Sequence, residues 1–264
     1  MRPEDYPPQE PLSLLGTRYV AELARRAEGA PLPALEHAWG EDPYQSVALW
    51  PAAAPGAPIL VFLHGGGWTS GYKEWMAFMA PAALAAGFAY AVAGYRLAPT
   101  HCFPDMLADV RGAIAEVRRR AAAVNGDPAR LHVGGHSAGG HLAACVAADE
   151  GIAGCLPVSG IYRFGEGSGL LQRPRFLRDG EDGEREASPV LNPPARTPVL
   201  LAWGTRDFPH LIPQAEEMAA VQRKAGGTAE TLVLDGCDHF EASLAAGDPT
   251  GPWICRAAAL AGLG

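Results

Sequence analysis

The chain is poor in cysteine and has no excess of positive charge. Its 264 residues include five cysteines, an odd number without a CxxC pair, so neither a disulfide framework nor a zinc site is expected. The formal net charge is −8, and nucleic acid is not an expected partner because phosphate binding requires a basic face. We expect a cytoplasmic protein that binds a small molecule, and a homodimer stays open.

Signals for export and membrane insertion are also missing. The opening residues MRPEDYPPQEP are acidic and broken by proline, whereas a signal peptide starts with a basic region followed by an apolar one. The alanine-rich stretches are interrupted by glycine, proline or charge before they reach membrane-spanning length. We therefore expect no membrane partner.

Short apolar segments alternate with segments of helical spacing along most of the chain. The predicted strands are 35–39, 46–50, 58–63, 88–93, 131–134, 154–159, 198–203 and 230–234. The predicted helices are 12–28, 74–86, 105–123, 138–148, 213–224 and 253–263. This alternation predicts one α/β domain over residues 1–264, with an eight-stranded, mostly parallel sheet and helices on both faces. Ligands bind at the carboxyl ends of the strands in such sheets.

Two segments are expected near the mouth of that binding site. One is the N-terminal segment, residues 1–33, and the other is 163–187, which is rich in Gly, Arg, Glu and Asp and breaks the alternation. A stretch of this composition inside a domain is usually a functional loop or a disordered one. For 163–187, a cover over the pocket and a solvated loop are both open.

The strongest functional signal is Gly135-His136-Ser137-Ala138-Gly139, which fits G-x-S-x-G between a predicted strand and a predicted helix. A nucleophile on so tight a turn needs small neighbours at the two glycine positions. The turn also places the Ser137 hydroxyl at a helix N-terminus, which favours developing negative charge. The alternative is a glycine-rich turn with a capping serine. The flanking elements favour Ser137 as a catalytic nucleophile.

A second glycine cluster, His64-Gly65-Gly66-Gly67-Trp68, follows the predicted strand 58–63. Its glycines let the backbone approach a substrate and present N–H groups to an oxyanion. We predict an oxyanion hole formed by the amides of Gly66, Gly67 and Ala138, the residue after the nucleophile. A phosphate-binding loop is the alternative, but no Lys-Ser/Thr follows and the spacing is not G-x-G-x-x-G. His64 is expected to hold the loop by a hydrogen bond.

A serine hydroxyl needs a base that is itself oriented by a carboxylate, and in this kind of site the chain order is Ser, acid, His. Asp207 follows the strand 198–203 and His239 follows the strand 230–234, so both reach the same sheet edge as Ser137. We predict His239 as the general base and Asp207 as its partner, with no metal and no cofactor. His210, beside Asp207, is the rival base. The remaining nearby carboxylates are expected to be turn residues, namely Asp235 and Asp238.

Large aromatic residues have two interpretations that the sequence leaves open. They line an acyl pocket, or they belong to the core, as most buried aromatics do. The three tryptophans concerned are Trp68, Trp75 and Trp203.

Several segments resemble known esterases of the α/β-hydrolase fold. HGGGW (64–68), GYRLAP (94–99), FPDMLADV (103–110) and GHSAGGHLAA (135–144) are similar to the group related to hormone-sensitive lipase. From about Leu35 onward the chain resembles the arylformamidase (kynurenine formamidase) branch, on KEWMAFMAPAALAAGF (73–88), VSGIYRF (158–164), GTRDFP (204–209) and CDHFEASL (237–244). The resemblance implies catalytic Ser137, Asp207 and His239, no cofactor, and cleavage of N-formyl aryl amides such as N-formylkynurenine, with some activity on aryl esters.

Three functions follow as hypotheses. The first is a serine hydrolase that cleaves a small acyl, formyl-type aryl amide or ester through an acyl-enzyme. The second is a general short-acyl carboxylesterase, which Gly67 and the YRLAP segment favour because both are more typical of esterases. The third is a non-catalytic small-molecule-binding protein on the same fold. Such proteins typically lose the base or the nucleophile, and this chain retains both.

Overall fold

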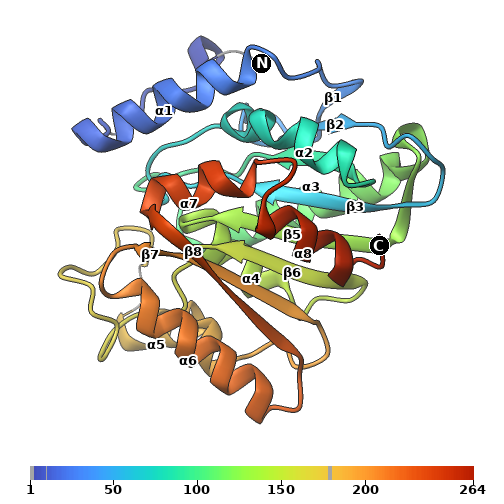
Figure 1. The fold of residues 1–264 in the computed structure, drawn as a ribbon. Coiled ribbons are helices and arrows are strands. Elements are labelled where there is room, and N and C mark those ends of the chain that lie inside the picture. Colours follow the sequence, from blue (N-terminus) through green and yellow to red (C-terminus); the bar gives the residue numbers. More distant parts are fainter. Residues whose placement is uncertain (1–2, 10, 178–179) are drawn as a thin grey trace.

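An eight-stranded sheet runs through the centre of the molecule (Figure 1), in the order β1-β2-β4-β3-β5-β6-β7-β8. The computed structural model describes residues 3–9, 11–177 and 180–264. The β1–β2 and β2–β4 pairs are antiparallel, and all other neighbouring pairs are parallel. The strands are β1 Leu35–Ala38, β2 Ser46–Trp50, β3 Ala57–Leu63, β4 Ala89–Ala93, β5 Gly126–His136, β6 Ile152–Val158, β7 Val199–Arg206 and β8 Ala229–Asp238. The predicted fold class is confirmed.

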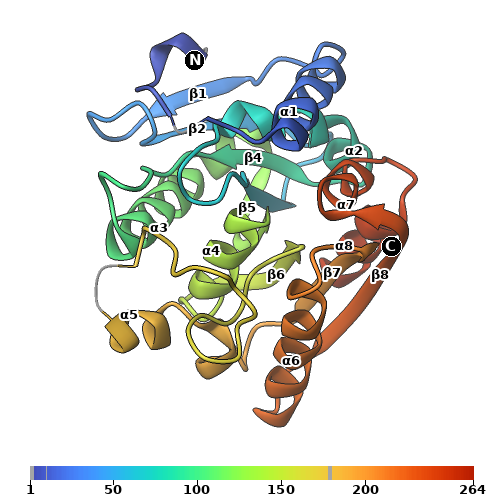
Figure 2. The same ribbon diagram turned by 90° about the vertical axis from the view of Figure 1, so that its left-hand side faces the viewer.

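Helices cover both faces of the sheet, and Figure 2 shows the two layers from the side. The α-helices are α1 Leu14–Ala27, α2 Ala80–Ala85, α3 Phe103–Arg120, α4 Ala138–Val146, α5 Gly180–Glu186, α6 Leu211–Lys224, α7 His239–Ala246 and α8 Pro252–Leu260. Short 3₁₀ helices span Pro3–Asp5, Lys73–Met79, Ala121–Val124 and Pro189–Leu191. Within the described ranges, no helix has both the length and the apolar character needed to cross a membrane.

The alternation of side chains along β3 shows how the sheet divides the core. Val61 and Leu63 belong to a buried cluster with α3, α4 and α6, whereas Leu60 and Phe62 belong to a second cluster with α1, α2, α7 and α8. Successive side chains on a strand point to opposite faces, so a strand that is apolar at every position is buried on both. Every residue of β3 is buried. This continuous apolar run fixes β3 at the middle of the sheet.

One segment that is predicted as a single helix forms two helices of different type. The segment predicted as a helix over 74–86 is a 3₁₀ helix over Lys73–Met79 followed by α2, which starts at Ala80. Pro81 lacks an N–H and therefore fits only the first turn of an α-helix. The proline accordingly starts α2 instead of continuing a longer helix. Two helices, α5 and α7, lie outside the predicted elements.

The N-terminal helix α1 rests on the body through few residues. Ser13 caps it by accepting a hydrogen bond from the Gly16 amide at 3.1 Å. Tyr19 and Leu23 are buried against the second core cluster, whereas Leu14 and Leu15 are exposed. The attachment of α1 therefore depends on a narrow apolar stripe.

We expect Leu23→Ala to lower the free energy of unfolding by about 2–5 kcal/mol, because it leaves a cavity in the core. Leu15→Ala removes the same atoms from a side chain that is 58% exposed. This control should change the free energy of unfolding by less than about 0.5 kcal/mol. Urea denaturation of both variants measures the difference, and equal effects would contradict the role of Leu23 in holding α1.

Candidate active site

Ser137 lies on a sharp turn between β5 and α4, with φ 54° and ψ −118°. An L-residue rarely adopts a positive φ, so the surrounding packing must enforce it. A Cβ at Gly139 would lie 2.3 Å from the Leu63 carbonyl oxygen, and a Cβ at Gly135 would lie 2.4 Å from the Gly139 backbone. Only glycine fits at both positions. The local geometry is the strand–turn–helix arrangement that the G-x-S-x-G pattern predicts.

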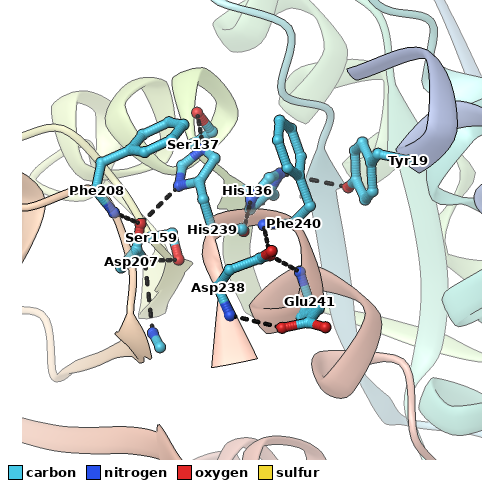
Figure 3. Close-up of polar contacts among 11 residues, drawn as sticks. Tyr19, His136, Ser137, Ser159, Asp207, Phe208, Asp238, His239, Phe240 and Glu241 are labelled. Atoms are coloured by element: carbon cyan, nitrogen blue, oxygen red, sulfur yellow. Dashed lines mark hydrogen bonds and ion pairs between the residues drawn. The ribbon is translucent and has the colours of Figure 1, made fainter. Parts of the chain in front are cut away.

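Three predicted side chains meet in one chain of hydrogen bonds (Figure 3). The Ser137 hydroxyl lies 2.9 Å from Nε2 of His239, and Nδ1 of His239 lies 2.8 Å from Oδ1 of Asp207. A carboxylate only accepts, so Nδ1 carries the proton and donates it to Asp207, and Nε2 is left to accept from Ser137. His239 and Asp207 are buried, and Ser137 is partly exposed. The arrangement can take a proton from the serine hydroxyl.

The Asp207 carboxylate is held by donors on both oxygens. Ser159 donates to Oδ2 at 2.5 Å, and the Phe208 amide donates to Oδ1 at 2.7 Å. Burial on its own would raise the pKa of Asp207, but the hydrogen bond and charge of His239, with the bonds from Ser159 and Phe208, bring that pKa below its ordinary value. Asp207 is therefore ionised wherever His239 acts as a base. Ser159, at the end of β6, did not emerge from the sequence as a site residue.

The other candidate residues do not join this chain of hydrogen bonds. His210 stacks near Phe208, with ring centroids 6.1 Å apart, and makes no hydrogen bond to Ser137 or Asp207 in the described structure. Asp235 is exposed, and Asp238 caps a helix. Phe208 itself stacks on the His239 ring with centroids 4.3 Å apart, which holds the imidazole from one side.

His239 is the first residue of α7, a helix absent from the sequence predictions. Asp238 accepts hydrogen bonds from the amides of Phe240 and Glu241 at 2.9 and 2.8 Å, and Glu241 accepts from the Asp238 amide at 2.9 Å. This reciprocal pair is a capping box. The Asp-x-x-Glu spacing at 238–241 was the available signal for α7. The box fixes the backbone from which the His239 ring projects.

The glycine loop after β3 presents amides without partners. The Gly66 carbonyl accepts from the Ser70 amide at 3.0 Å, which closes a tight turn, and φ of Gly66 and Gly67 is 116° and 61°. Among the described residues, no acceptor bonds to the amides of Gly66, Gly67 or Ala138. His64 donates from Nδ1 to the Gly65 carbonyl at 2.7 Å, and burial lowers its pKa to about 4. His64 is thus a neutral side chain bonded within the loop.

A cavity of about 200 Å³ opens beside Ser137 and His239. Its walls come from four regions: the segment around the start of α1, the glycine loop, the 3₁₀ helix Lys73–Met79, and the end of β5 with the segments after β5, β7 and β8. The lining residues are Leu12, Ser13, Gly16, Tyr19, Val20, Gly66, Gly67, Trp75, His136, Ser137, Phe208, His239 and Phe240. A larger cavity of about 370 Å³ lies over residues 97–101 and contains no residue of the Ser137–His239–Asp207 chain.

The sequence is similar to that of several known esterases. The BD-FAE family model matches residues 48–154. A probable isoprenylcysteine alpha-carbonyl methylesterase of Oryza sativa is 31% identical over 77% of this chain and 56% of its own length. Esterase LipC of Mycobacterium tuberculosis is 32% identical over 81% of this chain and 61% of its own length. This chain thus spans less than two thirds of either curated relative.

Two solved structures have a similar fold. The carboxylesterase EstE1, cloned from a metagenomic library, superposes with a TM-score of 0.73 at 21% identity over 94% of this chain and 96% of its own. Esterase Est2 of Thermogutta terrifontis, solved with propionate bound, gives 0.60 at 26% identity over 74% and 79% of the two chains. The chain has the α/β-hydrolase fold.

In this α/β-hydrolase the three tryptophans have different places. Trp75 lines the cavity, and Trp203 is buried in the core. Trp68 donates to Nδ1 of His141 at 3.1 Å and stacks on Phe176 with centroids 4.4 Å apart. The described part of 163–187 is therefore anchored to the body at Phe176, and none of its residues lines the cavity.

The described residues of the α/β-hydrolase contain no group of three His, Cys, Asp or Glu side chains arranged to hold a metal ion. The titratable groups around Ser137 are already committed to one another, as the bonds of His239 and Asp207 show. These two hydrogen bonds allow a proton to pass from the Ser137 hydroxyl to His239.

The lowered pKa of Asp207 predicts how stability depends on pH. In the unfolded chain an aspartate titrates near pH 3.9, and in the folded α/β-hydrolase Asp207 titrates lower. Its contribution is therefore fully present above about pH 4 and is lost as the pH falls through the folded pKa. We expect Asp207→Asn to flatten the dependence of the unfolding free energy on pH below about 4, measured by urea denaturation. Parallel curves for both proteins would contradict the assignment.

Proposed function

We propose that the protein hydrolyses small-acyl esters with Ser137 as nucleophile. The observation that supports this most is the hydrogen-bond chain from Asp207 through His239 to Ser137, which ends at a cavity lined by the glycine loop. The esterase names of its relatives agree with this chemistry. Among the described residues, the rival His210 has no hydrogen bond to either Ser137 or Asp207.

In the first half of the reaction Ser137 gives its hydroxyl proton to Nε2 of His239 while its oxygen attacks the ester carbonyl carbon. The imidazolium that forms is stabilised by Asp207, which stays ionised. Negative charge moves onto the carbonyl oxygen, and the amides of Gly66, Gly67 and Ala138 donate to it. One such donor stabilises the transition state by about 3–4 kcal/mol.

Collapse of this intermediate breaks the ester C–O bond. The leaving oxygen takes the proton from His239, and the acyl group stays on Ser137. Water then enters, gives a proton to His239 and attacks the acyl carbon. The carboxylic acid leaves, and the proton returns from His239 to Ser137. The protein ends in its starting state, with one water consumed.

The volume and the lining of the cavity favour a small substrate that contains an aromatic ring. Its volume of about 200 Å³ lies below the roughly 300–1,000 Å³ of sites for drug-sized ligands. Besides its histidines, four aromatic side chains among the described residues contribute to its walls, and flat aromatic groups pack well against such rings. These are Tyr19, Trp75, Phe208 and Phe240. We therefore place a short acyl group and an aryl leaving group in the site.

We expect Ser137→Ala to lower kcat/KM for p-nitrophenyl acetate by about 10⁴-fold or more, because the nucleophile is lost. A fluorophosphonate probe should label the wild-type protein at Ser137 and leave the variant unlabelled. Thr231→Ala, which removes an exposed hydroxyl on β8, is the control and should keep both properties. Hydrolysis by Ser137→Ala at the wild-type rate would contradict the proposal. The absence of an adduct on the wild-type protein would favour the non-catalytic binding protein.

N-formyl aryl amides are the second candidate substrates. The resemblance to the arylformamidase branch supports them. A formyl group is also the smallest acyl group, so it fits a cavity of this volume. An amide leaves less readily than an aryl oxygen, so protonation by His239 at the leaving nitrogen becomes more important. The same side chains serve both reactions.

A substrate panel separates the two candidates. With p-nitrophenyl esters, we expect kcat/KM to fall by more than about 10-fold from acetate to octanoate, because the longer chain exceeds the cavity. N-formylkynurenine should be hydrolysed, and its N-acetyl analogue should be at least about 10-fold slower. A preference for octanoate would contradict the proposed acyl size. Ester turnover without any turnover of the formamide would contradict the second candidate alone.

A further inference from the structure

His136, the residue before the nucleophile, bonds to the backbone of the proposed catalytic histidine. Its Nε2 lies 2.9 Å from the carbonyl oxygen of His239, and the ring is buried. A carbonyl oxygen only accepts, so Nε2 carries the proton and Nδ1 does not. The two imidazole rings lie with centroids 4.8 Å apart (Figure 3). The side chain thus spans the gap between the turn at Ser137 and the start of α7.

This gap is not closed by the sheet. Ser137 follows β5 and His239 follows β8, and β6 and β7 lie between these two strands. Small changes in sheet twist therefore add up over three strand pairs before they reach the contact between Ser137 and His239. A direct hydrogen bond from His136 to His239 bypasses these pairs.

His136 also lies against the glycine loop and close to Tyr19 of α1. A Cβ added at Gly65 would lie 3.0 Å from Nδ1 of His136, so the ring packs closely against the glycine loop. The Tyr19 hydroxyl lies 3.4 Å from the same Nδ1 and donates to Ser243 on α7 at 2.7 Å. Burial, followed by the charge of His239, lowers the pKa of His136 to about 3, so the ring stays neutral across the working pH range.

We propose that His136 is a positioning residue, which sets the distance between Ser137 and His239 through its hydrogen bond to the His239 carbonyl. The inference rests on the proposed esterase function for its kinetic consequence. It does not rest on that function for the bond itself. A misplacement of about 1 Å between reacting groups is enough to cost about 100-fold in rate.

The kinetic test uses two variants at one position. We expect His136→Leu, which fills the space without a donor, to lower kcat for p-nitrophenyl acetate by about 10–100-fold and to leave KM within about 2-fold. His136→Gln has an amide N–H that can reach the same carbonyl, and we expect it to recover at least half of the loss on a logarithmic scale. Rates are normalised to the fraction of protein that a fluorophosphonate titrates.

His132→Leu is the matched control, because His132 is also a buried histidine of β5 but bonds to the Arg130 carbonyl, away from the site. It should lower stability and leave kcat unchanged. A merely structural role for His136 would produce the same pattern in His136→Leu. Wild-type kcat in His136→Leu, or equal losses in the Leu and Gln variants, would overturn the inference.

A measurement without catalysis keeps the inference separate from the function. In ¹⁵N-labelled wild-type protein and in Ser137→Ala, NMR should show a slowly exchanging Nε2–H at His136 that persists from pH 5 to 8. A His136 ring that titrates in this range, or that carries its proton on Nδ1, would overturn the inference even if ester hydrolysis is intact. A protein without esterase activity that shows this Nε2–H would contradict the proposed function and leave the bond standing.

Discussion

The positive φ at Ser137 can exist only because three segments of backbone meet around it without side chains between them. Gly135 packs on Gly139, and Gly139 packs on the carbonyls of Leu63 and His64. A strained non-glycine residue costs about 1–3 kcal/mol, and this packing has to supply it. The contact with residues 63 and 64 has a second effect, because the glycine loop begins there. The constraint that shapes the turn at Ser137 also brings the glycine loop next to it.

The remaining parts reach this turn from distant strands, each held by a local device. Asp207 follows β7 and is fixed by donors from Ser159 and Phe208. His239 follows β8 and is fixed by a capping box at the start of α7. These devices differ in kind, but each holds a side chain at the carboxyl edge of the sheet. Preorganisation of this type means that little rearrangement is needed when charge develops.

The parts of the site that sequence patterns could predict are those encoded by neighbouring residues. The glycines at 135 and 139 and the cluster at 65–67 reveal their turns because backbone sterics allow few other residues there. Asp207 and His239 could be placed because each follows an apolar strand. The bond between His136 and His239 joins positions 103 residues apart, and that between Tyr19 and Ser243 joins positions 224 apart. No local pattern encodes such contacts, because they depend on how α1 and α7 pack over the sheet. The α7 helix itself had a signal at 238–241, but its apolar residues were too few to show helical spacing.

Residues 12–20 form one wall of the cavity, whereas the three side chains of the hydrogen-bond chain, Ser137, Asp207 and His239, all come from residue 137 onward. This wall and the three hydrogen-bonded side chains are therefore encoded in different stretches of the chain, and mutations can alter the first during evolution while the second is preserved. Tyr19 limits this independence. Tyr19 lines the cavity and its hydroxyl bonds to the helix that carries His239, so a change of this wall that removes Tyr19 also removes a contact that supports this helix.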